Sequence, residues 1–437
     1  MQVSVRVPKK KSKSVLVVEP KEESAATQAQ STRQDGKGIT FPKGFKAAGV
    51  HCGIRKAKKD VALIVSDEPA AFAAAYTTNK VKAAPLIVCE SNLSDHCEAI
   101  VINSGNANCM TGQQGLADAW EMVSATAQHL GIEPGLVAVA STGVIGRALP
   151  MDAVRVGIQE AARSLDYGPD AGSSASDAIL TTDTFAKLAE IEIALSGGKV
   201  RLGGMAKGAG MIAPEMRVGH ATTLSFVTTD AKVSPALLRK LLSSGVDSSF
   251  NQITIDGDTS TNDMCAVLAN GASGVTVEDA DDVRKFAGAL TQILQSLASS
   301  VARDGEGATK LIEVVVTGAA SDDDARKIAK TVASSSLVKS AVWGADPNPG
   351  RIAAAAGRAG AELVVEKMTV TLGKGASATA IISKGALNES DLEKARAAFQ
   401  EKEVVISIDL GLGPGKSRAW GCDLTPEYVD INGRYTT

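Results

Sequence analysis

Threonine, asparagine and glycine, rather than histidine or cysteine, gather in the runs of this sequence that could do chemistry. The runs are residues 103–108 (NSGNAN), 141–146 (STGVIG), 181–184 (TTDT), 207–212 (KGAGMI) and 221–224 (ATTL). Any one of them is typical of a turn, because Gly, Asn, Asp and Ser dominate turns. Several together are harder to explain in that way. Threonine is a nucleophile when its own terminal amine is the base, which requires the threonine to begin a chain.

The motifs of other common enzyme and metal sites are absent from the sequence. Residues 203–208 (GGMAKG) lack the phosphate-loop spacing, and residues 411–415 (GLGPG) do not continue as a dinucleotide loop. The acidic run 256–263 (DGDTSTND) has its glycine in the wrong place for an EF-hand and no closing Glu. The six cysteines are scattered without a CxxC pair, which argues against zinc and disulfides and favours a reducing compartment. We expect neither a metal nor a bound cofactor.

Composition limits the class of protein further. The 437 residues are 44% hydrophobic and 22% charged, a balance unlike that of a disordered chain. The 46 Lys and Arg against 49 Asp and Glu leave no positive excess for nucleic acid. The sequence contains no uninterrupted apolar run of about 18 residues, so we expect a soluble protein without a membrane partner. Small molecules remain as the expected ligands.

The first 37 residues differ from the rest of the chain. Lysines at positions 9–11 are followed by Glu19, Glu22 and Glu23, and then by a run rich in Ser, Thr and Gln. We expect residues 1–37 to be a flexible extension. Transit peptides are basic, Ser-rich and poor in acids, which fits the first fifteen residues but not the next ten. The extension indicates the plastid (chloroplast) stroma, with the mitochondrial matrix and the cytoplasm as alternatives.

From Ile39 onward, short strand patterns alternate with helix patterns, as in α/β proteins. The predicted helices are residues 116–130, 151–165, 235–242, 282–302 and 323–333. The predicted strands are 61–66, 99–104, 136–141, 189–195, 199–205, 223–229, 311–317, 368–372 and 404–409. Residues 189–205 alternate strictly around a Ser-Gly-Gly turn and predict a hairpin. The mixture predicts an α/β (α+β) fold of stacked helix and sheet layers, not a purely parallel Rossmann sheet.

A set of longer motifs, in a fixed order, resembles one known family. The motifs are residues 41–45 (FPKGF), 141–146, 207–214 (KGAGMIAP), 249–254 (SFNQIT), 304–310 (DGEGATK) and 420–425 (WGCDLT). From about residue 38 to residue 437 the chain is similar to the ornithine acetyltransferase (glutamate N-acetyltransferase, ArgJ type) family of arginine biosynthesis. The resemblance implies a helix-sheet-sheet-helix sandwich of the self-processing ArgJ/DmpA-like type.

The resemblance also implies a self-cleaved enzyme. The cut would fall between Ala221 and Thr222, giving an alpha chain (38–221) and a beta chain (222–437) that assemble as a heterotetramer of two alpha and two beta chains. The hydroxyl of Thr222 would attack the acetyl group of N2-acetyl-L-ornithine, and the freed amine of Thr222 would take the proton. L-Glutamate would then collect the acetyl group from the threonine ester, in a ping-pong sequence.

Further roles are implied by the same motif matches. Thr142 and Gly143 match the oxyanion pair. The implied substrate contacts are Thr181, Lys207, Thr222, Glu306, Asn432 and Thr437. Lys207 suits an α-carboxylate and Glu306 suits the positive side chain of ornithine.

One departure from the family pattern lies beside the predicted cut. Where the family usually reads Pro-Asn-Met-Ala-Thr, this chain has four additional residues, 217–220 (RVGH). This departure leaves an uncleaved chain open as an alternative, and one further alternative and one additional activity stay open for other reasons. Acetyl-CoA would be the co-substrate of a second glutamate N-acetyltransferase activity found in part of the family. An amidohydrolase or aminopeptidase would use the same scaffold, and an uncleaved chain would only bind acetylated amino acids.

Overall fold

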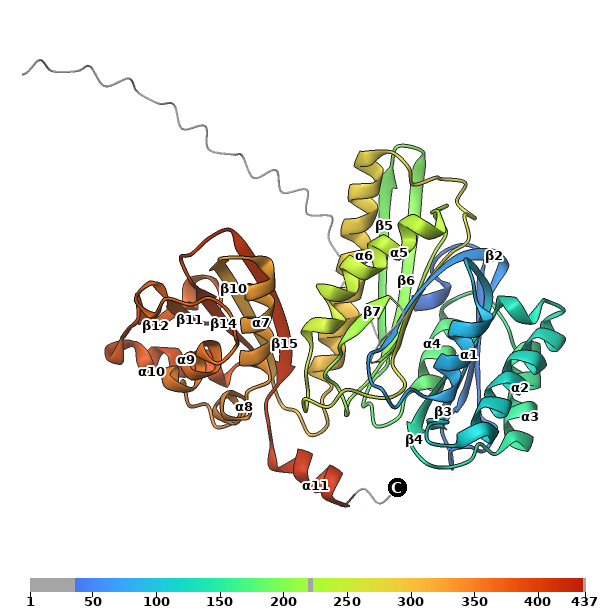
Figure 1. Ribbon diagram of the computed structural model, residues 1–437, viewed down its shortest axis with the longest axis horizontal. Coiled ribbons are helices and arrows are strands. Elements are labelled where there is room, and N and C mark those ends of the chain that lie inside the picture. Colours follow the sequence, from blue (N-terminus) through green and yellow to red (C-terminus); the bar gives the residue numbers. More distant parts are fainter. Residues whose placement is uncertain (1–35, 219–222, 435–437) are drawn as a thin grey trace, which may run out of the picture.

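The computed structural model describes residues 36–218 and 223–434, which form a larger and a smaller α/β lobe (Figure 1). The larger lobe is built on a mixed sheet with the strand order β4-β3-β2-β9-β8-β6-β5, and β1 and β7 both pair with β2. Its strands are β1 (Phe45–Val50), β2 (Val61–Thr77), β3 (His96–Asn106), β4 (Val137–Val144), β5 (Lys187–Leu195), β6 (Gly198–Lys207), β7 (Met216–Val218), β8 (Leu224–Thr229) and β9 (Met264–Ala269). Its helices are α1 (Ala84–Asn92), α2 (Gly112–Leu130), α3 (Met151–Arg163), α4 (Pro169–Ile179), α5 (Pro235–Asp247) and α6 (Ala280–Arg303), with 3-10 turns η1 (Gly38–Thr40), η2 (Pro134–Leu136) and η3 (Phe250–Gln252).

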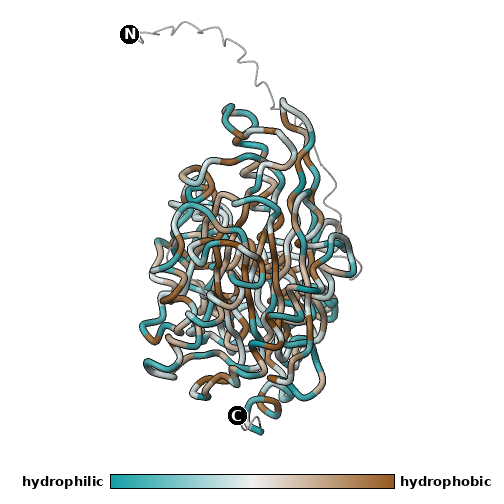
Figure 2. Tube along the Cα trace, turned by 90° about the vertical axis from the view of Figure 1, so that its right-hand side faces the viewer, coloured by the Kyte–Doolittle hydropathy of each residue, from teal (hydrophilic) through white to brown (hydrophobic). Residues whose placement is uncertain are grey.

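The larger sheet is covered on both faces, which is why every residue of β8 and β9 is buried. Two adjacent glycines of β6 show what covers it. A Cβ on Gly203 would lie 1.9 Å from the carbonyl oxygen of Gly38 in η1, and a Cβ on Gly204 would lie 2.9 Å from Leu297 of α6. Neighbouring residues of a strand point to opposite faces, so η1 and α6 pack on opposite sides of the sheet. Figure 2 shows the hydrophobic segments concentrated along the strands in the interior.

The smaller lobe has its own core and its own sheet, ordered β13-β12-β11-β14-β10-β15. Its strands are β10 (Leu311–Ala319), β11 (Thr369–Leu372), β12 (Thr379–Ser383), β13 (Ala386–Leu387), β14 (Glu403–Asp409) and β15 (Gly415–Cys422). Its helices are α7 (Asp322–Ala333), α8 (Ser336–Trp343), α9 (Pro349–Gly357) and α10 (Leu392–Gln400), with 3-10 turns η4 (Val365–Lys367), η5 (Gly375–Ser377) and η6 (Glu389–Asp391). The last helix, α11 (Pro426–Arg434), lies below both lobes in Figure 1.

The predicted mixed α/β fold of stacked layers is confirmed. The predicted hairpin is present as β5 and β6, paired from Lys187↔Ala206 to Leu195↔Gly198. The predicted strand 61–66 is only the first part of β2, which continues to Thr77 through a register shift between Val65 and Ala70. Within the described residues, no helix has the length and apolar character needed to cross a bilayer. The predicted extension lies almost wholly in residues 1–35, outside the described part of the chain.

Candidate functional site

A cavity of about 320 Å³ gathers most of the polar runs that stand out in the sequence. Its lining residues come from segments far apart in the chain: Ala107, Thr142–Ile145, Thr181, Thr182, Lys207, Gly210–Ile212, Thr223, Leu224, Ser260–Asp263, Glu306 and Asn432. Six residues with an implied role line this one cavity: Thr142, Gly143, Thr181, Lys207, Glu306 and Asn432. The other three, Ala221, Thr222 and Thr437, lie outside the described residues, although Thr223 lines the wall directly after Thr222.

Thr142 and Gly143 lie at the carboxyl end of β4, beside the end of the parallel strand β3. Gly143 has φ +133°, and a Cβ there would lie 2.3 Å from the carbonyl carbon of Gly105, so this position excludes any side chain. The Asn262 side chain fixes the strand end, because its Nδ2 donates to the carbonyl of Ser141 at 2.9 Å. The hydroxyl and the backbone N–H groups of such a rigid turn are suited to stabilise a developing oxyanion.

Lys207 ends β6 and is 8% exposed, with its Nζ donating to Thr142 Oγ1 at 3.2 Å. Burial lowers the pKa of Lys207, and the neighbouring Asp183 carboxylate opposes that shift. Burial would by itself raise the pKa of Asp183, but Lys207 and Lys187 outweigh it and hold that pKa well below its usual range. The cavity wall therefore contains an ammonium group with a buried counter-ion behind it.

Glu306 supplies the opposite charge in the same cavity. Its backbone N–H donates to the carbonyl of Ala209 at 2.8 Å, which places it beside the glycine-rich loop after β6. Its carboxylate packs on Gly210, where a Cβ would lie 2.5 Å from Oε2. Asn432 of α11 donates from Nδ2 to Glu306 Oε2 at 2.8 Å. A ligand that carries both a carboxylate and a cationic group matches the charges of Lys207 and Glu306.

Asp263 is a cavity residue that sequence reasoning missed. It directly precedes β9, is 4% exposed, and has no hydrogen-bond partner for Oδ2 among the described residues. Burial raises the pKa of Asp263 well above its ordinary value, and Lys207 opposes this. The dense polar run 256–263 is the sequence signal that could have found Asp263, but its spacing was compared only with that of a calcium-binding loop. In that run Asp256 instead accepts hydrogen bonds from the backbone of Met211 and Ile212, at 2.7 and 2.9 Å.

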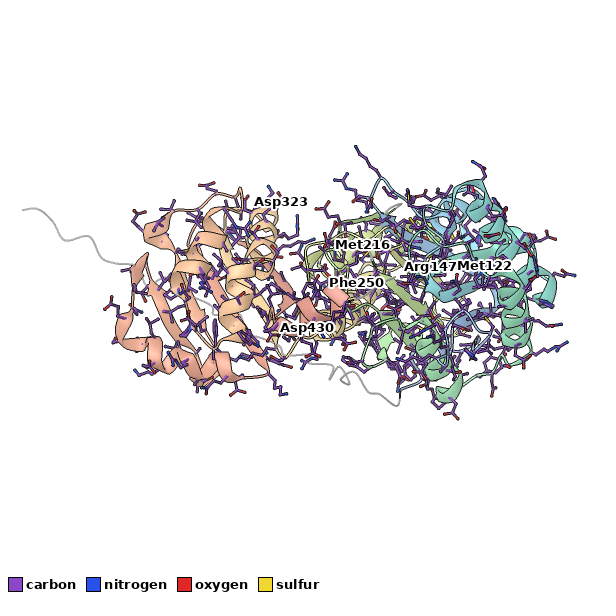
Figure 3. The ribbon with its side chains drawn as sticks, turned by 90° about the horizontal axis from the view of Figure 1, so that it is seen from below. Met122, Arg147, Met216, Phe250, Asp323 and Asp430 are labelled. Atoms are coloured by element: carbon purple, nitrogen blue, oxygen red, sulfur yellow. The ribbon has the colours of Figure 1, made fainter. Side chains whose placement is uncertain are left out.

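The segment that leads toward the predicted cut is held in place as far as β7. Thr77 of β2 pairs with Met216, whose N–H donates to Asn251 Oδ1 at 2.5 Å and whose carbonyl accepts from Asn251 Nδ2 at 2.7 Å. Lys330 of α7 donates to the carbonyl of Pro214 at 2.5 Å. Figure 3 shows Met216 close to Phe250 in the larger lobe, on the side that faces the smaller lobe. The first two of the four additional residues thus belong to β7, and the other two lie outside the described residues.

Comparisons with known proteins match most of this chain to one family. The ArgJ family model matches residues 46–437. The arginine biosynthesis bifunctional protein ArgJ of Symbiobacterium thermophilum is 50% identical over 406 residues, covering 92% of this chain and 98% of that protein. The protein of the same name from Dehalococcoides mccartyi is 47% identical over 406 residues, covering 91% and 97%.

Two solved structures are also similar in sequence. The ArgJ protein of Bacillus halodurans is 41% identical, with coverage of 42% of this chain and 96% of that chain and a TM-score of 0.41. The ornithine acetyltransferase of Mycobacterium tuberculosis, solved in complex with ornithine, is 37% identical, with coverage of 42% and 97% and a TM-score of 0.39. On the family match and the identities to full-length relatives, this chain belongs to the ArgJ family of arginine-biosynthesis enzymes.

Proposed function

We propose that this protein transfers the acetyl group of N2-acetyl-L-ornithine to L-glutamate. The observation that carries the proposal is the pair of opposite charges, Lys207 and Glu306, on the wall of the cavity that also contains Thr142 and Gly143. N2-Acetyl-L-ornithine has an α-carboxylate for Lys207 and a side-chain ammonium for Glu306. The M. tuberculosis relative bound to ornithine supports the same ligand class.

The proposed reaction has two halves that share one acyl-enzyme. Thr222 Oγ attacks the acetyl carbonyl while the terminal amine of Thr222 accepts the hydroxyl proton. The tetrahedral oxygen is stabilised by Thr142 and Gly143, where each donor contributes about 3 kcal/mol in comparable sites. The C–N bond breaks, the amine nitrogen of ornithine takes the proton, and an acetyl-threonine ester remains. The amine of glutamate then attacks this ester and regenerates the Thr222 hydroxyl.

The proposed scission leaves two chains that share one sheet. In the larger lobe, β6 precedes the proposed cut in the chain and β8 follows it. These two strands pair from Leu202↔Thr229 to Lys207↔Leu224. Strand β9 likewise pairs with β2. This pairing supports alpha and beta chains that stay associated after cleavage, and a heterotetramer of two alpha and two beta chains remains part of the proposal.

Intact mass and N-terminal sequencing of the purified protein test the proposal directly. We expect a fragment that begins at Thr222, its loss in Thr222→Ala, and formation of acetylglutamate from N2-acetylornithine. An uncleaved chain with full transferase activity would overturn the role of the terminal amine. Release of free acetate without acetylglutamate would indicate an amidohydrolase, and binding without turnover would indicate a binding protein. Supplying acetyl-CoA with glutamate tests the second activity.

We also propose that residues 1–37 direct the protein to a plastid. The basic, Ser-containing first fifteen residues support this. A fusion of residues 1–37 to a fluorescent protein should accumulate in plastids of plant cells. Accumulation in mitochondria or in the cytoplasm would overturn the assignment.

A further inference from the structure

A buried lysine lies behind the cavity, between two buried carboxylates. Lys187, the first residue of β5, is 0% exposed. Its Nζ lies 2.6 Å from Asp183 Oδ1 and 2.5 Å from Asp304 Oδ2. Both aspartates are 4% exposed. None of these groups has an implied role in the reaction, although ions so fully removed from water are rare unless they are paired.

The first carboxylate connects Lys187 to two segments of the cavity wall. Asp183 Oδ2 accepts from the backbone N–H of Thr181 at 2.9 Å. Asp183 Oδ1 accepts from the backbone N–H of Gly208 at 2.6 Å, directly after Lys207. One carboxylate therefore fixes the turn that carries Thr181 and the strand end that carries Lys207.

The second carboxylate connects Lys187 to the third segment. Asp304 caps the carboxyl end of α6 and precedes Glu306 by two residues. Its Oδ2 accepts from the backbone N–H of Thr184 at 3.0 Å, and its Oδ1 accepts from the Thr184 hydroxyl. The segments that carry Thr181, Lys207 and Glu306 thus meet at one ammonium group.

Besides backbone contacts such as the one from the Glu306 N–H to the Ala209 carbonyl, the charge of Lys187 helps to hold these segments together. Removal of one partner from a buried ionic group leaves an uncompensated charge. Without Lys187, the carboxylates of Asp183 and Asp304 would repel each other. Lys207 is the other cation that acts on Asp183, so its ammonium would be drawn toward that carboxylate and away from the cavity. The segment of Lys207 and the segment of Glu306 would both shift, so the distance between these two residues would change.

We propose that Lys187 is a positioning residue that sets the spacing between Lys207 and Glu306, and so selects the length of the substrate between its carboxylate and its cationic group. This inference rests on the proposed function, which assigns those two groups to the two ends of ornithine. It adds a specificity determinant that does not touch the substrate. A residue of this kind affects discrimination between homologous substrates, whereas general loss of packing lowers activity toward all of them.

The test compares Lys187→Met with Lys199→Met, using N2-acetyl-L-ornithine and the one-methylene-longer N2-acetyl-L-lysine. Lys199 lies on the partner strand β6 and also forms an ion pair, with Glu192, but its side chain is 74% exposed. Intact mass gives the cleaved fraction of each variant, so that kinetic constants are expressed per cleaved molecule.

For Lys187→Met we expect KM for acetylornithine to rise about tenfold or more, with a smaller decrease in kcat because Lys207 Nζ also donates to Thr142 Oγ1. One methylene is typically worth about 10- to 200-fold in a shaped site, so the preference for acetylornithine should fall at least about fivefold. Lys199→Met should keep both constants and the preference. Equal losses for the two substrates, or a lower kcat at constant KM, would overturn the proposal.

Thr184→Val provides a variant that leaves every buried ion in place. It removes one donor to Asp304 and keeps the side-chain volume, so the same loss of preference should appear at a reduced size. Calorimetry with ornithine and lysine separates this proposal from the proposed function. If the wild type binds ornithine but transfers no acetyl group, the proposed function fails while the ratio of the two affinities still tests Lys187. If Lys187→Met and Thr184→Val are folded and have the same ratio of ornithine to lysine affinity as the wild type, the positioning role is refuted.

Discussion

Asn432 of α11 donates a hydrogen bond to Glu306 Oε2 over 2.8 Å, and this contact joins the last helix to the cavity. No residue of α11 is buried, and Val429 is 65% exposed, so apolar packing contributes little to the position of the helix. A second contact, from Thr425 Oγ1 to the carbonyl of Gly307 at 2.8 Å, holds the start of the helix on the same loop. The C-terminal helix is therefore oriented by polar contacts with the loop that carries Glu306.

Asn432→Ala should weaken substrate binding without affecting the fold. The lost hydrogen bond to a carboxylate on an accessible helix is worth about 1 kcal/mol, which corresponds to about a fivefold increase in KM. Asp430→Ala is the matched control on the same helix, because Asp430 pairs only with the exposed Arg434 among the interactions described for it. Steady-state kinetics with N2-acetylornithine provide the measurement. An unchanged KM in Asn432→Ala would show that Glu306 does not need this partner.

Lys207→Met should reduce kcat/KM for N2-acetylornithine by about 100-fold or more, because a desolvated ion pair with the substrate carboxylate is lost. It also removes the donor to Thr142 Oγ1, so both KM and kcat should change. Lys232→Met, at an exposed lysine remote from the cavity lining, is the control and should behave as wild type. Wild-type KM in Lys207→Met would contradict the assignment of Lys207 to the carboxylate.

Asp263→Asn should make the protein more stable, and increasingly so as the pH rises. The folded-state pKa of Asp263 is raised above its ordinary value of 3.8, because burial disfavours the charged form. The stability associated with this group is therefore present at low pH and is lost as the pH rises toward the folded-state pKa. Asparagine has the same shape and does not titrate.

Melting temperatures of wild type and Asp263→Asn between about pH 5 and pH 8 provide the measurement. The melting temperature of Asp263→Asn should exceed that of the wild type by an amount that grows with pH. A constant difference across this range would show that Asp263 does not carry a raised pKa in the folded protein.

Lys330 should make the free energy of unfolding rise with pH in the alkaline range, which is the opposite of the dependence expected for Asp263. Burial lowers the pKa of Lys330 from 10.5 to about 8, and Glu215 partly opposes the shift. Between these values the unfolded chain binds more protons than the folded one, so Lys330 becomes less destabilising as the pH rises. The full change is about 3 kcal/mol of unfolding free energy, as an order of magnitude.

Urea unfolding of wild type and Lys330→Met at about pH 7 and about pH 10 tests this sign. The variant also loses the donor to the Pro214 carbonyl, but that loss is the same at both pH values because methionine does not titrate. Wild type should gain stability relative to Lys330→Met at the higher pH. A loss of wild-type stability relative to Lys330→Met at pH 10 would contradict a lowered pKa of Lys330.

The accuracy of the secondary-structure prediction followed the strength of the local pattern. Strict alternation around a glycine turn predicted β5 and β6, and regular apolar spacing predicted α6. Helices α1 and α9 have nine residues each, too few for a clear apolar period, and were not predicted. Residues 67–69 (Asp-Glu-Pro) look like the end of a strand, but β2 continues through them because its second half pairs with β9. Pairing with a distant strand is not visible in local periodicity.

The sequence by itself determined the fold class, the family motifs and the identity of the polar residues that carry an implied role. Only the tertiary structure decided which polar groups lose contact with water and which distant groups become their partners. Lys187 and Asp304 are 117 positions apart and form a buried ion pair, and Asp263 has a raised pKa because it is enclosed by other segments. Desolvation and charge pairing depend on which segments surround a side chain, and no spacing along the chain specifies that.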